Sequence, residues 1–236
     1  LPICWALVAL VLAGWCRSEL WRERAQLRAQ WWQYALLGCL GMVICGAWVY
    51  HAAHTSPAMN IALIYAAAPV LIAVGAGLWL GEKLNRVQVA GVCLTLAGVL
   101  HVVAKGNWVQ LAQFQFVTGD LWMLAVTTAW AAYSLLLKRW PSPLGATARL
   151  AAMSLGALPF LLLGAVWEQT QPNALPWSWA STVLVLLAAF VPGLAAYAIY
   201  GWTQKLLGAT RVAMSLYLGP LYAALTAWGV LGESLG

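Results

Sequence analysis

The sequence AMNIALIYAAAPVLIAVGAGLWLGEKL, residues 58–84, occurs a second time in the chain in a weaker form. A shift of 151 residues aligns it without a gap on ATRVAMSLYLGPLYAALTAWGVLGESL, residues 209–235, and nine of the 27 positions are identical. The identical pairs include Pro69 with Pro220 and Glu82 with Glu233. Solenoid repeats recur every ~20–50 residues, so one repetition at this long interval predicts two homologous halves instead.

The composition places the chain in a membrane. Hydrophobic residues make up 64% of it and charged residues 8%, which is too much apolar surface for a soluble core of 236 residues. Runs of about 20 apolar residues cross a bilayer as helices, whereas the strands of membrane barrels alternate in short segments. The sequence therefore predicts an all-α polytopic membrane protein. The runs that qualify as spans are residues 2–16, 31–54, 57–80, 87–104, 119–137, 146–167, 181–204 and 209–231.

The basic residues indicate how the chain crosses the membrane. Of the 12 lysines and arginines, all but Lys105 fall in loops on one side of the predicted spans. Short cytoplasmic loops carry an excess of basic residues, so we predict that this side is cytoplasmic and that the linker, residues 105–118, is outside. The net charge of +6 is then a topology signal, and we expect no nucleic acid partner. The cytoplasmic set is Arg17, Arg22, Arg24, Arg28, Lys83, Arg86, Lys138, Arg139, Arg149, Lys205 and Arg211.

This topology gives the two copies of the repeat opposite orientations. Glu82 falls at a cytoplasmic helix end and Glu233 at an outer one, so the halves, residues 1–104 and 119–236, are predicted to be inverted. The same shift places a counterpart of helix 119–137 before residue 1 and a counterpart of helix 87–104 beyond residue 236. We therefore expect eight transmembrane helices of a ten-helix, five-plus-five inverted repeat that lacks about one helix at each end.

The repeated segment and its surroundings resemble the EamA-type transporters of the drug/metabolite transporter superfamily. The resemblance rests on PVLIAVGAGLWLGEKL and PLYAALTAWGVLGESL, on the Gly-rich helix GVCLTLAGVL, and on GDLWMLAVTTAWAAYSLLLKR, which is similar to the family's first helix of the second half. It implies a multi-pass protein, expected in a bacterial inner membrane, that exports small organic solutes by alternating access through a cavity between the halves. Its partners would be a small-molecule solute and the lipid bilayer, with no cofactor. The sequence does not indicate an oligomeric state.

Two prolines mark the expected cavity. Pro69 and Pro220 lie about twelve residues into their spans, where a proline frees the carbonyl four residues earlier, at Tyr65 and Leu216. Neighbouring helices can satisfy such carbonyls, but transporters with inverted repeats bind their solutes at the midplane along the repeat interface. We favour prolines that face a cavity. Pro192 is expected to break the preceding span at a similar depth.

Aromatic residues in mid-span are candidates for the lining of this cavity. Trp and Tyr near span ends are ordinary interfacial anchors, but a buried tyrosine needs a partner for its hydroxyl, and several at midplane depth suit a wet pocket. Packing in the bundle is the alternative. As a lining they would suit an uncharged or zwitterionic solute, amino-acid-like or aromatic. The candidates are Trp48, Tyr50, Tyr65, Trp130, Tyr133, Tyr197, Tyr200 and Tyr217.

The carboxylates are interpreted as helix-end residues. Glu82 and Glu233 end their copies of the repeat, and we predict interfacial ion pairs for them, for example Glu82 with Lys83 or Arg86, with a gating role as the alternative. Asp120 opens a helix, where a negative charge suits the helix dipole. The sequence places no carboxylate in mid-membrane, which argues against a carboxylate proton relay.

A transporter is favoured over two other classes. A membrane-embedded enzyme would need clustered His, Asp or Glu at a membrane face, and the sequence shows no such cluster. His51 and His54 share a helix face, but no third ligand at suitable spacing completes a metal site. A non-transporting structural membrane protein would leave the duplication unexplained. The five cysteines lie in apolar runs, and we expect them to be buried small hydrophobic residues.

Overall fold

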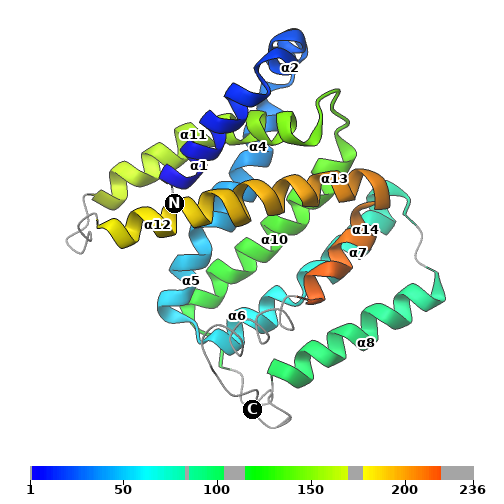
Figure 1. The fold of residues 1–236 in the computed structure, drawn as a ribbon. Helices are drawn as coiled ribbons and strands as arrows, with labels where there is room; N and C mark the ends of the chain where they lie inside the picture. The colour runs from blue at the N-terminus through cyan, green and yellow to red at the C-terminus, as the bar shows by residue number, and fades with distance from the viewer. Residues whose placement is uncertain (1, 83–84, 104–114, 170–177, 219–236) are drawn as a thin grey trace. The chain divides into compact units, whose positions relative to one another are not determined.

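The computed structural model describes residues 2–82, 85–103, 115–169 and 178–218, and its regular elements in these ranges are helical. Figure 1 shows the helices in chain order. They are α1 (Pro2–Trp15), α2 (Arg17–Arg22), α3 (Arg24–Ala29), α4 (Trp31–Gly38), η1 (Cys39–Trp48), α5 (Val49–Thr55), α6 (Ala58–Tyr65), α7 (Ala68–Gly75), η2 (Ala76–Leu80), α8 (Arg86–Val103), α10 (Thr118–Arg139), α11 (Ala146–Gln169), α12 (Trp179–Ala188), η3 (Ala189–Ala196), α13 (Tyr197–Leu207), α14 (Ala209–Met214) and η4 (Ser215–Leu218).

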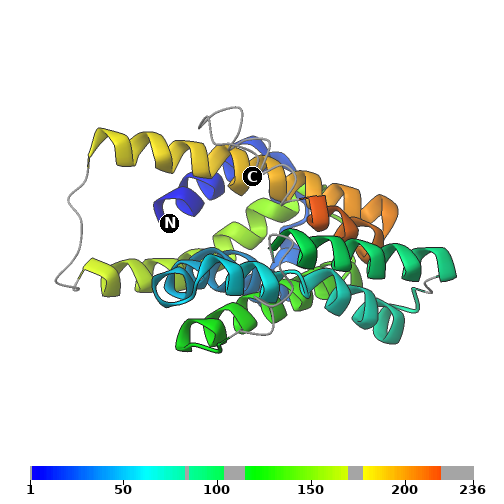
Figure 2. The same ribbon diagram turned by 90° about the horizontal axis from the view of Figure 1, so that it is seen from below.

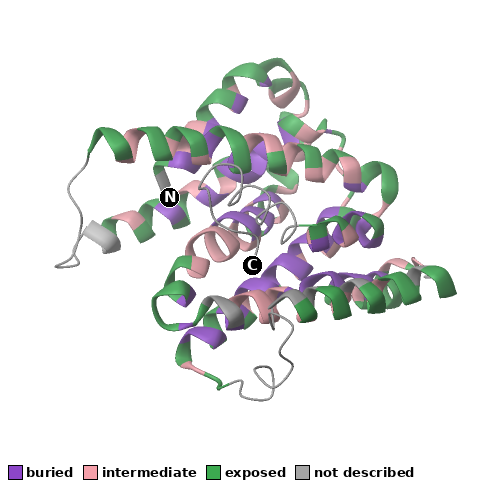
Figure 3. Cartoon of the chain, turned by 60° about the horizontal axis from the view of Figure 1, so that its bottom comes forward, coloured by how far each residue is buried: buried purple, intermediate pink, exposed green. Residues whose placement is uncertain are grey.

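Five helical segments in the described ranges are long and apolar enough to cross a membrane. They match five of the predicted spans, and exposed side chains run along them (Figure 3), as expected for helices that face lipid. The three other predicted spans correspond to α1, which has 14 residues, to α8, and to the segment that begins with α14. The multi-pass helical character is therefore confirmed, whereas the total of eight spans stays a prediction. The five segments are Trp31–Thr55, Asn60–Leu80, Thr118–Arg139, Ala146–Val166 and Trp179–Leu207.

The chain divides into two compact units, and each unit takes segments from both halves of the sequence. Unit 1 consists of Leu1–Tyr50 and Leu136–Leu206, and unit 2 of His51–Leu135 and Leu207–Gly236. The boundaries fall inside α5, α10 and α13. A compact unit of this protein is thus not the same thing as a sequence half.

In unit 1, α1 and α4 both pack along α11. Small residues allow the backbones of α4 and α11 to approach closely. A Cβ atom on Gly156 would lie 2.8 Å from the Cα atom of Ala35, and a Cβ atom on Gly38 would overlap the carbonyl oxygen of Met153. Lipid supplies no hydrophobic force between helices, so close packing of this kind is a main source of helix association in membranes.

Two basic side chains of unit 1 hold the loop between α10 and α11. The Nζ atom of Lys205 donates to the carbonyl of Leu144 at 2.8 Å, and a guanidinium nitrogen of Arg149 donates to the carbonyl of Trp140 at 2.7 Å. Arg149 is 5% exposed. Both residues belong to the predicted cytoplasmic set, and the structure gives them a packing role in addition to the topological one.

The expected helix break at Pro192 is wrong, because α12, η3 and α13 form one continuous helical rod (Figure 2). Pro192 lies inside η3, which has π-helical hydrogen bonding. A π turn changes which carbonyl each N–H reaches, so the helix passes a residue without an N–H and continues. A second π segment, η1, offers the carbonyl of Gly41 to the hydroxyl of Tyr197 on α13.

We expect Gly156→Leu to destabilise the protein, because the added side chain must displace the backbone of α4. Overpacking of this kind costs about 1–3 kcal/mol, so the midpoint of thermal unfolding in detergent should fall by several degrees. Gly164→Leu is the matched control on the same helix, since a Cβ atom there meets no atom within 4 Å. Equal midpoints for the two variants would show that α4 and α11 do not pack as described.

Candidate functional site

Both copies of the repeated segment lie in unit 2. The first copy forms α6, α7 and η2, and the described part of the second copy forms α14 and η4. α7 and α14 lie side by side (Figure 1). The two copies of the repeat therefore contact each other through α7 and α14. This contact is the candidate functional site.

The helix of the first copy is irregular just before Pro69, although the backbone there stays in the right-handed helical region. α6 ends at Tyr65, and α7 begins at Ala68 with Pro69 in its first turn. A proline suits this position, since its fixed φ angle is helical and the first turn needs no N–H donor. Ala66 and Ala67 form the break between the two helices.

The hydroxyl of Tyr217 donates to the carbonyl of Ala66 at 3.1 Å. The two residues are 7% and 6% exposed, and Leu96 and Met214 pack against them. Carbonyls at a helix end are short of partners in their own helix, so the tyrosine supplies a donor where the first copy is broken. Tyr217 and Ala66 are 151 residues apart, which is the interval of the repeat.

The carboxylate of Glu82 lies at the N-terminus of α14. Its Oε1 atom accepts from the N–H of Ala209 at 3.0 Å, and its Oε2 atom accepts from the N–H of Thr210 at 3.1 Å. The first N–H groups of a helix lack partners within the helix, and the helix dipole favours a negative charge there. Gly208 makes room, because a Cβ atom on it would lie 2.8 Å from Oε1, and its φ of +88° also favours glycine.

These two contacts show that the described parts of the two copies run antiparallel. The end of the first copy, at Glu82, meets the start of the second copy, at Ala209. Ala66, the ninth of 27 residues in the first copy, meets Tyr217, the ninth residue of the second. Two parallel segments would bring start to start and end to end.

The contact of Glu82 with α14 was not predicted from the sequence. The local spacing predicted an ion pair with Lys83 or Arg86, and Lys83 lies outside the described residues, as do Pro220 and Glu233. The partners of Glu82 are 127 and 128 residues away, and local spacing carries no signal for so distant a cap. The repeat itself was the available signal, because it shows that Glu82 ends one copy and Ala209 begins the other.

The predicted cavity-lining residues of unit 2 lie on α6, α10 and η4. Trp130 and Tyr133 stack on each other on α10, with ring centroids 5.3 Å apart and an interplanar angle of 29°. Trp130 is 8% exposed and Tyr133 is fully buried. Tyr65 on α6 is half-buried, and Tyr217 is held by its bond to the break. Packing explains Tyr217 directly, and a solute role for these residues stays a prediction.

The predicted lining residues of unit 1 differ in their surroundings. Tyr197 packs edge-on against Trp5 on α1, with centroids 5.1 Å apart at 85°. Trp48 and Tyr200 are half-buried, whereas Tyr50 is 60% exposed. Tyr197 thus joins three helical segments of its unit, because its hydroxyl also binds η1.

A buried carboxylate network in unit 2 is a further feature that the sequence did not predict. Asp120 is fully buried in the first turn of α10, where the sequence analysis placed it. Its carboxylate accepts from the hydroxyl of Ser56 at 2.6 Å, from the side-chain amide of Asn60 at 2.8 Å and from the N–H of Val117 at 2.9 Å. The network ties the start of α10 to the turn before α6 and to α6 itself.

Histidine and cysteine form no site in the described part of the chain. No group of three His, Cys, Asp or Glu side chains there could hold a metal ion. The ring of His51 lies 5.8 Å from that of Trp122. Cys4 and Cys16 are buried as expected, whereas Cys93 is exposed on α8.

Comparison with known proteins agrees with a chain of apolar membrane helices. The model of the EamA-like transporter family matches residues 2–104 and 117–236. The chain belongs to this family. No solved structure matches it.

The EamA-family chain is also similar to proteins that are named as uncharacterized transporters. One from Archaeoglobus fulgidus is 26% identical over 210 residues, which cover 87% of this chain and 70% of the relative. YyaM from Bacillus subtilis is 24% identical over 213 residues, which cover 88% and 68%. YvbV from the same species is 29% identical over 174 residues, which cover 71% and 53%. The family and these names indicate a membrane transporter and not an enzyme.

We expect Asp120→Asn to destabilise this EamA-family chain. The amide would place an NH₂ group among donors that now converge on a carboxylate, and an unsatisfied buried group costs about 1–3 kcal/mol. The midpoint of thermal unfolding in detergent should fall accordingly. Glu23→Gln is the control, because it removes a carboxylate from the exposed ion pair of Glu23 with Arg22, and such pairs contribute little. A fall in the control as large as that in Asp120→Asn would contradict the role of the network.

Proposed function

We propose that this protein is a secondary transporter of the bacterial inner membrane that exports small organic metabolites, amino-acid-like or aromatic, by alternating access between two inverted halves. The observation that carries the proposal is the antiparallel contact of the two repeat copies, from Glu82 to Ala209 and from Ala66 to Tyr217. Inverted repeats of this kind underlie many secondary transporters.

The bond between Ala66 and Tyr217 supports a two-fold relation between the copies. Under a two-fold axis, a contact from position i to position j is matched by one from j to i, so a residue meets its own counterpart only close to the axis. Ala66 and Tyr217 are counterparts at the repeat interval. Their contact locates the proposed axis beside the break that precedes Pro69, near the middle of the predicted span.

The contact of Glu82 with α14 is proposed to close one face of the transporter. The predicted topology puts Glu82 at the cytoplasmic face, and the repeat gives Glu233 the same position in the second copy, at the outer face. A carboxylate that holds two backbone N–H groups can release them without breaking the core, because water can take its place. Alternation would form such a contact at one face while it opens the other.

The stacked pair of Trp130 and Tyr133 is proposed as part of the solute site. Two stacked rings with centroids 5.3 Å apart present an apolar face of fixed orientation, and the polar edges of Trp and Tyr can orient a zwitterionic or aromatic ligand. Tyr65 and Pro69 in unit 2, and Trp48, Tyr50, Tyr197 and Tyr200 in unit 1, are the other proposed lining residues. Tyr217 and Pro220 complete the proposed set.

The first experiment identifies a solute and then tests Trp130. A strain that expresses the full-length gene is screened for resistance to toxic analogues of amino acids and aromatic metabolites. With a protected analogue in hand, we expect Trp130→Ala to lose most of the resistance and Trp130→Phe to keep a large part of it, because phenylalanine retains a ring for stacking.

Trp122→Ala is the matched control, since Trp122 lies two turns earlier on α10 and is 39% exposed. Equal amounts of each variant in the membrane, measured by size-exclusion chromatography of a fluorescent fusion, separate loss of transport from loss of folding. If Trp130→Ala confers full resistance, Trp130 is not part of the solute site.

The second experiment tests the closing contact. In a background with the native cysteines replaced by alanine, Thr210→Cys places a thiol of nearly the same size at a residue that is 4% exposed and keeps its backbone N–H. We expect Glu82→Gln to raise the rate at which an impermeant maleimide labels this cysteine by about tenfold, because a charge-assisted bond is worth about 1.5–3 kcal/mol. Glu23→Gln in the same background should leave the rate unchanged. If Thr210→Cys is labelled at the same rate with Glu82 intact and in the Glu82→Gln variant, the contact is not a closing element.

A further inference from the structure

A surface hollow of about 500 Å³ lies in unit 1 where α1 passes into α2. Its lining residues recur at helical spacing on one face: Gly14, Trp15, Arg17, Ser18 and Trp21. Gly14 forms its floor, because a Cβ atom there would meet nothing within 4 Å. The space beside residue 14 is therefore open.

The hollow has one cationic lining residue, Arg17, and more arginines lie nearby in the sequence. Four arginines lie between residues 17 and 28, against two glutamates. Arg22 pairs with Glu23 at 3.2 Å, and the guanidinium of Arg24 lies 4.8 Å from the ring centroid of Trp21. Arg17 is exposed, and in the part of the chain that the structure describes its guanidinium has no hydrogen-bond or ion-pair partner. A positive group that is free to bind therefore faces the hollow.

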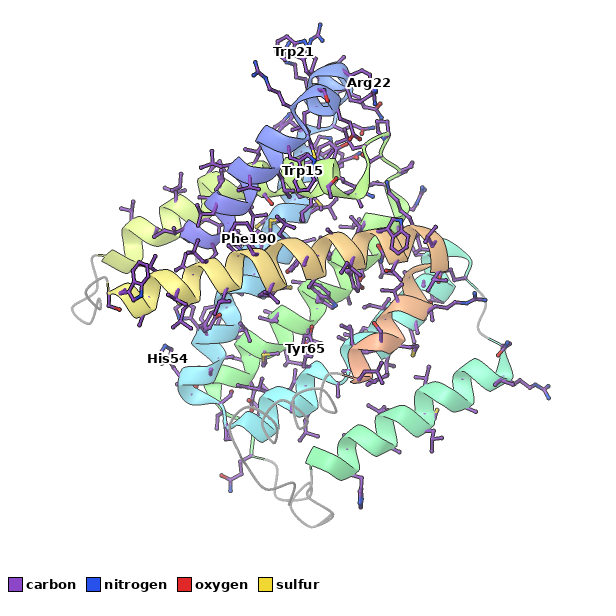
Figure 4. All side chains as sticks on the ribbon, viewed as in Figure 1. Trp15, Trp21, Arg22, His54, Tyr65 and Phe190 are labelled. Carbon is purple, nitrogen blue, oxygen red and sulfur yellow. The ribbon has the colours of Figure 1, made fainter. Side chains whose placement is uncertain are left out.

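Apolar groups border this charge on both sides. Trp15 is 81% exposed and Trp21 is 68% exposed, and Figure 4 shows Trp21 beside Arg22, with Trp15 nearer the N-terminus. Exposed tryptophans of this kind settle at the level of the lipid headgroups. Below Gly14, the same face of α1 carries Leu10, 69% exposed, and Ile3, 47% exposed. The surface thus changes from cationic to apolar along one helix face.

We propose that this hollow binds the headgroup of an anionic phospholipid. The Arg17 guanidinium and the Ser18 hydroxyl donate to the phosphate, Trp15 and Trp21 flank the glycerol region, and an acyl chain lies along Leu10 and Ile3. A guanidinium matches the oxygens of a phosphate with two donors, and basic clusters next to a membrane span attract anionic lipids.

Topology alone does not account for these features. The positive-inside effect needs basic residues near the span and places no demand on their shape, so it explains neither the glycine floor nor the two exposed tryptophans. At the repeat interval, the counterpart of residues 14–28 is residues 165–179, which contain no lysine or arginine. The predicted topology places this counterpart outside, where few basic residues are expected, so the arginines agree with topology, and the glycine floor and the exposed tryptophans are the features that go beyond it.

Native mass spectrometry of the full chain, released from nanodiscs of phosphatidylcholine that contain a minor fraction of phosphatidylglycerol, tests the proposal. We expect the wild-type protein to retain phosphatidylglycerol in preference to phosphatidylcholine. Arg17→Gln should lower this preference by about fivefold, which is the contribution of one arginine near an anionic surface. Gly14→Leu should lower it to a similar extent with all four arginines in place, because its side chain fills the floor.

Two controls separate the hollow from general charge and bulk. Lys138→Gln removes an exposed cation on α10 outside the hollow, and Gly164→Leu adds the same bulk at an open position of α11; both should retain the lipid as the wild type does. Melting temperatures of the purified variants verify folding. If Gly14→Leu retains phosphatidylglycerol like the wild type, or if Lys138→Gln loses it as Arg17→Gln does, the binding is diffuse and the proposal is overturned. Retention of both lipids to the same extent by the wild-type protein also overturns it.

Discussion

A backbone carbonyl or N–H group inside a bilayer has no water to bind, and each one must find a partner in the protein. This requirement shapes the region around the repeat. Where the first copy breaks ahead of Pro69, the hydroxyl of Tyr217 binds the carbonyl of Ala66. Where the second copy begins, Glu82 binds the first N–H groups of α14. In both cases a side chain of one copy forms a hydrogen bond with a backbone group at a helix end of the other copy. Each copy thus supplies hydrogen-bond partners that the other lacks.

Two carboxylates of the described residues, Glu82 and Asp120, therefore act as anchors for helix ends. Glu82 and Asp120 both lie at helix N-termini, and both have their oxygens occupied by N–H or O–H donors from segments far away in the sequence. Acidic side chains are costly in apolar surroundings unless such donors surround them. In a chain with 8% charged residues, placing them at helix starts uses the unpaired N–H groups that every helix exposes. Function in such a protein is better sought in contacts between helices than in a cluster of ionisable groups.

The sequence predicted the location of the spans well and the contacts between them poorly. Runs of apolar residues are local, so the segments that became Trp31–Thr55 and Thr118–Arg139 were recognised from composition. Asp120 was likewise placed correctly at a helix start, whereas Pro69, expected in mid-span, lies in the first turn of α7. The bonds that Ser56 and Asn60 make to Asp120 were missed, because polar side chains in an apolar run do not reveal their partners. Pro192 was misread, since a π segment that accommodates a proline has no sequence pattern of its own.

Unit 1 combines segments that are far apart in the sequence, which has a consequence for its synthesis at the ribosome. α1 packs along α11, and 130 residues separate the end of α1 from the start of α11. At ~5–20 residues per second, α1 is synthesised on the order of ten seconds before its partner emerges. During this interval α11 is not available to pack against it. The order of translation and the order of assembly therefore differ in this unit.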